Sequence, residues 1–232
     1  MADKEMIHTG HRQRLRQRFL EEGLDGFNEI NALELLLFYC VPRKDTNELA
    51  HRLIKYFGSY AAVLNAPFNE LKNVEGVSDQ IATYLALQRA AARYYMVSST
   101  ADGTVVRNTE EYGNVLMPYF VGRFNETVYL LCLDAKCKVL CCREINEGSV
   151  NTANISIRKL LDVVLSSNAT SAILAHNHPG GVAVPSPEDI QTTRRVEKAL
   201  DAVDVYLVDH LVIADNDYVS MRQSGYYVPQ HR

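Results

Sequence analysis

The chain has 232 residues, and its 28 acidic side chains outnumber its 24 basic ones, so the formal net charge is −4. Apolar residues make up 47%, which excludes a mainly disordered chain because enough apolar surface can be buried to offset the entropy of ordering. No apolar run approaches the roughly 18 residues of a membrane span, and the N-terminal residues lack the apolar stretch of a signal peptide. We therefore expect a cytoplasmic globular protein of one or two domains, with no membrane partner and with reduced cysteines.

Hydrophobic patterning changes near residue 100. Before this point, apolar residues recur at three- and four-residue spacing, as in Leu49, Leu53 and Phe57, which predicts helices. After it come runs with strand character, at residues 127–133 and 203–208. The pattern predicts an all-α domain followed by an α/β domain.

A segment of small polar residues at 98–103 is the predicted linker. We place the all-α domain at residues 1–98 and the α/β domain at residues 105–232. The first hundred residues carry twelve basic and twelve acidic side chains, so the net negative charge belongs to the rest of the chain. Any affinity for nucleic acid is therefore expected in the helical domain.

Four arginines alternate with other residues near the start of the helical domain, at Arg12, Arg14, Arg16 and Arg18. On a helix, Arg14 and Arg18 share one face, and Arg12 and Arg16 share another. Such a basic segment favours contacts with DNA phosphates. The alternative is a solvated helix face, with Leu15 and Phe19 packed inward.

A helical hairpin is predicted further along this domain. A helix at residues 69–73 is expected to end before Gly76, which permits the positive φ of a tight reversal, and Ser78 is the expected N-cap of the next helix. This pattern resembles a helix-hairpin-helix motif, in which backbone N–H groups at the loop contact a DNA phosphate. Ser78 stands where that motif usually has a second glycine, so simple helix packing is the alternative to DNA binding.

The segment at residues 171–189 gives the most specific indication of a chemical function. An apolar run at 172–175 predicts a buried strand, and His176 and His178 follow at its end. Residues two apart on a strand point to the same face, so both imidazoles are expected to project together. Asp189 falls on the first turn of a helix predicted at residues 188–200 and can reach back toward them. Two histidines and one aspartate leave a fourth position open for water, as catalytic zinc requires.

A structural explanation accounts for part of this segment. Ser186 as the N-cap, Pro187 as the first helical residue and Asp189 as the third form something close to a capping box without any metal.

The cysteines at 132, 137, 141 and 142 raise the question of a second metal site. Cys132 lies within a predicted strand, and Cys141 and Cys142 point to opposite faces if their run is extended. We therefore expect buried or edge thiols.

The metal segment carries a family resemblance. His176-x-His178-Pro179, followed after ten residues by Asp189 with a serine three residues before it, resembles the JAMM (MPN+) metalloprotease motif. The amino-acid sequence of residues 176–181 and 185–189 is similar to the corresponding segment of the RadC family. Residues 209–213 and 148–151 resemble further segments of that family, and the N-terminal stretch is similar to its helical half, so the resemblance covers nearly the whole chain. It implies a mixed sheet flanked by helices, in the cytidine-deaminase-like fold, preceded by an all-α helix-hairpin-helix-like domain.

The resemblance also implies roles for individual residues. His176, His178 and Asp189 would bind one zinc ion per chain, and Ser186 would stabilise an oxyanion beside the metal. A glutamate at the start of an upstream strand would take a proton from the attacking water. Glu126 directly precedes the predicted strand at 127–133 and is the first candidate, whereas Glu147, before Gly148 in a predicted turn, is the second.

Two functions follow as hypotheses. The first is a zinc-dependent hydrolase that cleaves a peptide or isopeptide bond in a protein or peptide substrate. The second is a DNA-binding accessory protein of repair or recombination, in which the zinc site is structural or vestigial. An HNH nuclease is excluded because no ββα finger with a distant third ligand is indicated. A deaminase is excluded because the His-x-Glu and Pro-Cys-x-x-Cys signature is absent.

Overall fold

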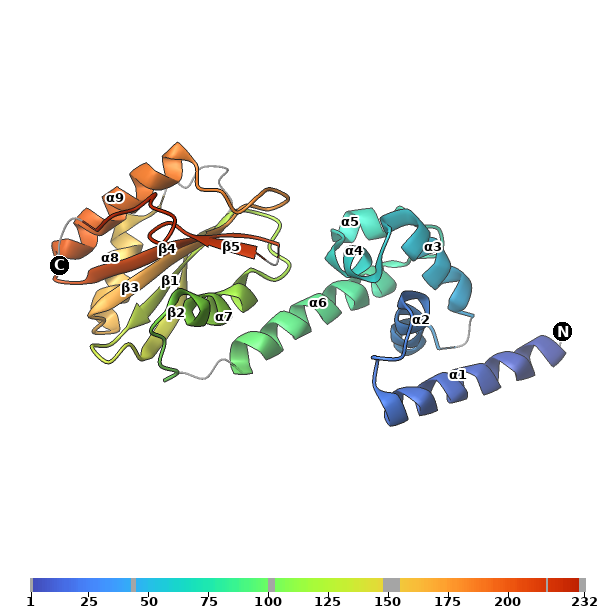
Figure 1. Ribbon diagram of the computed structural model, residues 1–232. Coiled ribbons are helices and arrows are strands. Elements are labelled where there is room, and N and C mark those ends of the chain that lie inside the picture. Colours follow the sequence, from blue (N-terminus) through green and yellow to red (C-terminus); the bar gives the residue numbers. More distant parts are fainter. Residues whose placement is uncertain (1, 43–44, 100–102, 148–154, 216, 230–232) are drawn as a thin grey trace. The chain divides into compact units, whose positions relative to one another are not determined.

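The computed structural model describes residues 2–42, 45–99, 103–147, 155–215 and 217–229, without the side chains of residues 2–9 and 147 (Figure 1). The chain forms two compact units, Met1–Ala92 and Arg93–Arg232, and their junction falls within one helix, α6 (Asp79–Ser99). The division into domains at 1–98 and 105–232 stays a prediction, because part of the expected linker, residues 100–102, lies outside the described residues.

The first unit is helical, as predicted. Before α6 it contains five helices among the described residues: α1 (Ala2–Glu22), α2 (Glu29–Cys40), α3 (Asn47–Phe57), α4 (Tyr60–Asn65) and α5 (Phe68–Leu71). Leu49 and Leu53, which showed the helical spacing, lie in its core, where Leu33, Leu37 and Leu53 are completely buried. Asn28 and Ser59 cap α2 and α4 by accepting hydrogen bonds from backbone N–H groups in the first turn.

The predicted turn is present between α5 and α6. Gly76 has a φ of +92°, where a Cβ would be strained, and the Ser78 hydroxyl accepts a hydrogen bond from the N–H of Ile81 (3.4 Å). The preceding helix is α5, which ends at Leu71, so the helix expected at 69–73 was placed too late. An ion pair between Lys72 and Asp79 (2.6 Å) also links the two sides of the turn. These contacts account for helix packing, and DNA binding by Gly76 and Ser78 stays a prediction.

The second unit contains a five-stranded mixed sheet (Figure 1). Its strand order is β2 (Val139–Glu147), β1 (Thr127–Leu133), β3 (Ser171–Asn177), β4 (Tyr206–Ala214) and β5 (Asp217–Ser220). Only β3 and β4 are parallel among these neighbours, and α9 (Pro187–Asp201) makes the crossover that a parallel pair needs. The predicted α/β fold with a mixed sheet is therefore confirmed.

Helices cover both faces of this sheet (Figure 1). Ala172 and Leu174 of β3 pack on α8 (Ile157–Ser166) and α9, whereas Ile173 and Ala175 belong to the core beneath α7 (Thr109–Phe120). His176 continues the first series, so its side chain points to the face that α9 covers.

The structure corrects two predicted boundaries. The strand expected at residues 203–208 begins only at Tyr206 and continues to Ala214, because Asp204 adopts a positive φ of 56° in the turn after α9. Helix α9 is one residue longer at each end than the predicted span of 188–200. None of the helices in the described ranges is long and apolar enough to cross a membrane.

The cysteine prediction agrees with the structure. All five cysteines are free, with Cys40 and Cys132 buried and Cys137 partly exposed. Cys141 packs against the core beneath α8 and α9, whereas Cys142 packs against the core beneath α7, so the two point to opposite faces of β2.

Candidate metal centre

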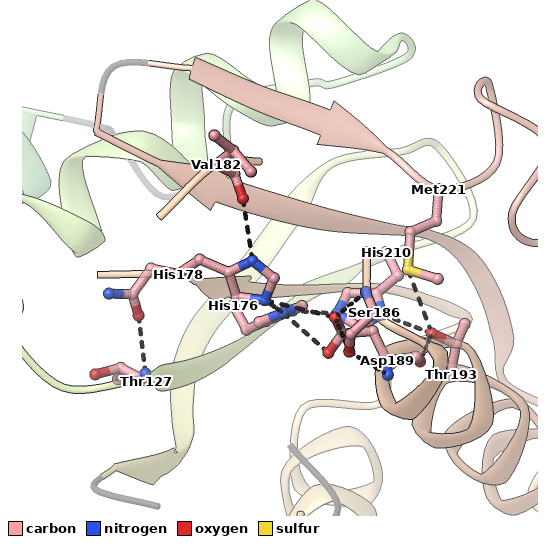
Figure 2. A network of polar contacts seen from close by, with 10 residues as sticks. Thr127, His176, His178, Val182, Ser186, Asp189, Thr193, His210 and Met221 are labelled. Carbon is pink, nitrogen blue, oxygen red and sulfur yellow. Dashed lines mark hydrogen bonds and ion pairs between the residues drawn. The ribbon is translucent and has the colours of Figure 1, made fainter. Parts of the chain in front are cut away.

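Two histidines and an aspartate from different elements converge at the end of β3 (Figure 2). His176 lies inside the strand, and His178 follows it, where its backbone N–H donates to the carbonyl oxygen of Ile213 on β4 (2.8 Å). Asp189 lies on the first turn of α9. The side chains of His176 and Asp189 are buried, whereas that of His178 is 20% exposed. His178 therefore forms the solvent-facing side of the group.

The distances among the three residues fit a shared cation. Nε2 of His176 lies 3.0 Å from Nε2 of His178 and 3.1 Å from Oδ1 of Asp189, and Nε2 of His178 lies 3.5 Å from Oδ2. Ligands placed tetrahedrally around zinc at about 2.0–2.1 Å are roughly 3.3 Å apart. Within the described part of the chain, this is the one group of three or more His, Cys, Asp or Glu side chains that converges in this way.

The protonation of His178 also suits a metal. Its Nδ1 lies 3.2 Å from the carbonyl oxygen of Val182, which can only accept, so Nδ1 carries the hydrogen and Nε2 of the neutral ring presents a lone pair. Burial by itself would raise the pKa of Asp189, but its contacts with His176 and His178 and the hydrogen bond from the N–H of Ser186 hold that pKa well below its usual range. The carboxylate of Asp189 in turn raises the pKa of His178. The imidazole nitrogens and the carboxylate oxygens thus converge on one point, and a cation bound there would stabilise this arrangement.

Ser186 and Asp189 form the predicted capping box. The Ser186 hydroxyl accepts from the N–H of Asp189 (3.1 Å) and donates to Oδ2 of Asp189 (2.7 Å), and the Ser186 N–H donates to the same oxygen (2.7 Å). These bonds hold the carboxylate so that Oδ1 faces His176. The cap therefore orients the candidate ligand, while the oxyanion role of Ser186 stays a prediction.

Glu126 directly precedes β1, as predicted, and interacts electrostatically with the three candidate ligands. Burial raises its pKa, and the nearby carboxylate of Asp189 acts in the same direction. Its Oε2 is buried without a hydrogen-bond partner among the described residues. A buried acceptor without a donor is costly and uncommon, and it fits a group that exchanges a proton with a bound molecule. Glu147 ends β2, and its side chain lies outside the described residues.

Comparison with known proteins identifies the family. The model of the RadC-like JAB domain matches residues 106–226, which include Glu126 and the three candidate ligands. The chain belongs to the RadC-like JAB domain family. A UPF0758 protein of Fusobacterium nucleatum is 32% identical over 232 residues, covering 97% of this chain and 99% of the relative. UPF0758 proteins of Ruegeria pomeroyi and Legionella pneumophila are also 32% identical, over 93% of this chain and 96% and 95% of their own lengths.

The predicted RadC resemblance is therefore confirmed. Of the two further segments that carried it, residues 209–213 lie in β4, whereas residues 148–151 lie outside the described part of the chain.

Sequence reasoning missed the role of Asn177, which lies between the two histidines of this RadC-family chain. Asn177 is buried, and its Oδ1 accepts from the N–H of Thr127 (2.8 Å). Its Nδ2 donates to the carbonyl oxygens of Asn125 (3.3 Å) and Arg123 (3.5 Å). These bonds hold the backbone on both sides of Glu126. Local spacing carried no signal of a contact with residues about fifty positions earlier.

Replacing Asn177 by Asp is expected to lower the free energy of unfolding by about 1–3 kcal/mol, because a carboxylate has no N–H groups for these two carbonyl oxygens. Chemical denaturation of the metal-free protein measures the change. Asn114→Asp, at an exposed position of α7, is the matched control and should stay within about 0.5 kcal/mol of the parent. A loss no larger than that of the control would contradict the role of Asn177.

Two more residues that sequence reasoning gave no role lie behind His176 (Figure 2). His210 on β4 is completely buried, and its Nε2 lies 2.8 Å from Nδ1 of His176. Burial lowers the pKa of His210 well below its ordinary value. Thr193, one turn after Asp189 on α9, contacts the other nitrogen of His210 (2.6 Å). The only sequence signal was the position of His210 in the segment that resembled the family.

The candidate DNA-binding arginines of α1 are engaged mainly within the helical unit. Arg12 donates to the carbonyl oxygens of Val41 (2.7 Å) and Pro42 (2.8 Å), just after the end of α2, and its guanidinium lies 4.6 Å from the centre of the Phe38 ring. It therefore satisfies carbonyl groups at a helix C-terminus.

Two of the other arginines also pack on aromatic rings. Arg16 lies over Tyr39 (5.6 Å), and Arg18 lies over Phe27 (4.8 Å) and pairs with Glu22, whereas Arg14 is exposed. Leu15 is buried, as the alternative of a solvated helix face predicts, but Phe19 does not pack inward as that alternative expects, since this residue is 38% exposed.

Arg12→Ala is expected to destabilise the protein by about 1–2 kcal/mol, because two carbonyl oxygens and an aromatic face lose their cation. Arg14→Ala is the matched variant and should change stability by less than about 0.5 kcal/mol. Thermal denaturation distinguishes them. If α1 binds DNA, Arg14→Ala should weaken binding to duplex DNA and reduce the salt slope by about 1. Unchanged affinity and slope would contradict a phosphate contact by Arg14.

Proposed function

We propose that the chain is a zinc-dependent hydrolase that cleaves an amide bond, either peptide or isopeptide, in a protein or peptide substrate. The observation that carries the proposal is the buried group of two imidazoles and a carboxylate, coupled to a glutamate with an unpartnered buried oxygen. Nitrogen and carboxylate ligands suit zinc, and three protein ligands leave a fourth position for water or substrate.

The proposed roles use side chains at or next to the candidate metal centre. When bound, the zinc supplies Lewis-acid chemistry that polarises the amide carbonyl and acidifies the attacking water. Glu126 accepts the proton of that water and later delivers it to the leaving amine, so its charge is restored after each turnover. Ser186 donates its hydroxyl hydrogen to the oxyanion. This step requires the hydroxyl to turn from Oδ2 of Asp189, to which it donates in the structure.

Two features support a catalytic site over a structural zinc site. Structural zinc sites are closed by four protein ligands, whereas three side chains converge among the described residues, and His178 is partly exposed. A structural site would also give no reason for a carboxylate oxygen to be buried without a donor near the ligands.

The proposal is tested with a mixed-sequence peptide library that includes lysine-branched isopeptides. The zinc-loaded protein should generate new amino groups detectable by mass spectrometry, chelator-treated protein should not, and added zinc should restore cleavage. Protein that holds one zinc per chain but cleaves nothing would contradict the hydrolase and favour the accessory-protein hypothesis.

A further inference from the structure

A line of three hydrogen bonds runs behind the metal centre from β3 through β4 to α9 (Figure 2). Nδ1 of His176 lies 2.8 Å from Nε2 of His210, and Nδ1 of His210 lies 2.6 Å from Oγ1 of Thr193. Oγ1 of Thr193 lies 2.6 Å from the backbone carbonyl oxygen of Asp189. All four residues are buried, with exposures of 1% or less. The line therefore begins at one candidate ligand and ends at the backbone of another.

The last member of this line determines the direction of every hydrogen. A carbonyl oxygen can only accept, so Thr193 donates its single hydroxyl hydrogen to Asp189. The other neighbour of the hydroxyl, Sδ of Met221 at 3.5 Å, is also an acceptor. Thr193 must then accept from His210, which places a hydrogen on Nδ1 of His210.

The same reasoning extends to His176. A completely buried imidazole is neutral and carries one hydrogen, so Nε2 of His210 has only a lone pair and accepts from Nδ1 of His176. In the neutral His176 ring, the form that a metal ligand must take, Nε2 consequently has no hydrogen. It presents its lone pair on the side where Nε2 of His178 and the carboxylate of Asp189 lie.

We propose that His210 and Thr193 are positioning residues that set the tautomer of His176 for metal binding. The inference rests on the metal-binding part of the proposed function and is independent of hydrolysis. A ligating nitrogen must be free of hydrogen, so the opposite tautomer has to be reversed before a metal can bind. Partners of this kind typically change metal affinity by about 10–100-fold. Thr193 also fixes the helix turn that carries Asp189, so one hydroxyl serves two ligands.

The decisive variant is Thr193→Val, which keeps the shape of the side chain and removes the hydroxyl. Nδ1 of His210 then loses its acceptor, and the His210–His176 pair can reverse, which places a hydrogen on Nε2 of His176. Competition with a chromophoric zinc chelator should show zinc affinity reduced about tenfold or more. Thr193→Ser retains the hydroxyl, so its zinc affinity should stay within about threefold of that of the parent. Thr192→Val, at the adjacent buried position of α9, is the control and should leave zinc affinity unchanged.

Long-range ¹H–¹⁵N NMR shows which nitrogen of each imidazole ring carries the hydrogen. A merely structural role of Thr193 would leave this tautomer unchanged. Metal-free parent protein should show His176 with its hydrogen on Nδ1, and Thr193→Val should increase the Nε2–H form. A zinc affinity of Thr193→Val equal to that of the parent, or an Nε2–H tautomer of His176 in the parent, overturns the proposal. A parent that binds no zinc overturns the proposed function instead, while the NMR measurement still decides the tautomer. If Thr193→Val does not fold, the parent spectrum still tests the proposal, because an Nε2–H tautomer of His176 there overturns it.

Discussion

Replacing His178 by Gln is expected to reduce zinc content from about one ion per chain to less than about one tenth. His178 is one of the three candidate ligands, and its side chain is partly exposed, so the substitution removes a candidate ligand atom without opening the core. The fully buried His176 is a poorer choice, because its loss would combine metal release with misfolding. Metal analysis after exhaustive dialysis measures the effect.

Asp189→Asn provides a second variant with a different chemistry. An amide oxygen can still accept from the N–H of Ser186, so the start of α9 should persist, whereas the negative charge at the metal position is lost. At a zinc concentration 100 times its dissociation constant, the parent should gain about 2.7 kcal/mol of stability, and neither variant should show this gain. His51→Gln, at an exposed position of α3, is the control and should bind zinc normally. Full zinc content in both ligand variants would refute the assignment.

Glu126→Gln is expected to slow amide cleavage by about 10²–10⁴-fold while zinc binding is retained. Glutamine has nearly the shape of glutamate but cannot accept the proton of the attacking water. The initial rate of release of new amino groups from the peptide library, at matched zinc content, measures the effect. Glu147→Gln distinguishes the second candidate: if that variant is inactive and Glu126→Gln is active, the base is Glu147.

Stability separates a catalytic effect of Glu126→Gln from damage to the fold. Burial raises the pKa of Glu126, so its ionised form is disfavoured in the folded protein at neutral pH. This penalty disappears below the ordinary glutamate pKa of about 4.3, where the group is protonated in both states. The metal-free variant should therefore unfold at the same or a higher temperature than the parent at pH 7. A clear fall in that temperature would mean that Glu126 stabilises the fold.

The sequence by itself determined the parts of the site that are encoded locally. His176 and His178 are two residues apart at a strand end, and Asp189 lies at the third position of a capped helix. Strand alternation and capping geometry act over a few residues, so the pattern predicted which side chains project together. The position of Glu126 before an apolar strand was likewise a local feature, as was the division between helical and α/β segments.

Only the tertiary structure decided which distant residues meet at this site. The antiparallel register of β1 and β3 places Val128 opposite His176, which brings Glu126 and the bonds of Asn177 to the ligands. The parallel pairing of β3 and β4 sets His210 behind His176. Periodicity in a sequence reports the type of element and its buried face, but it does not encode strand order or register. Those depend on how the faces of the whole sheet pack against α7, α8 and α9.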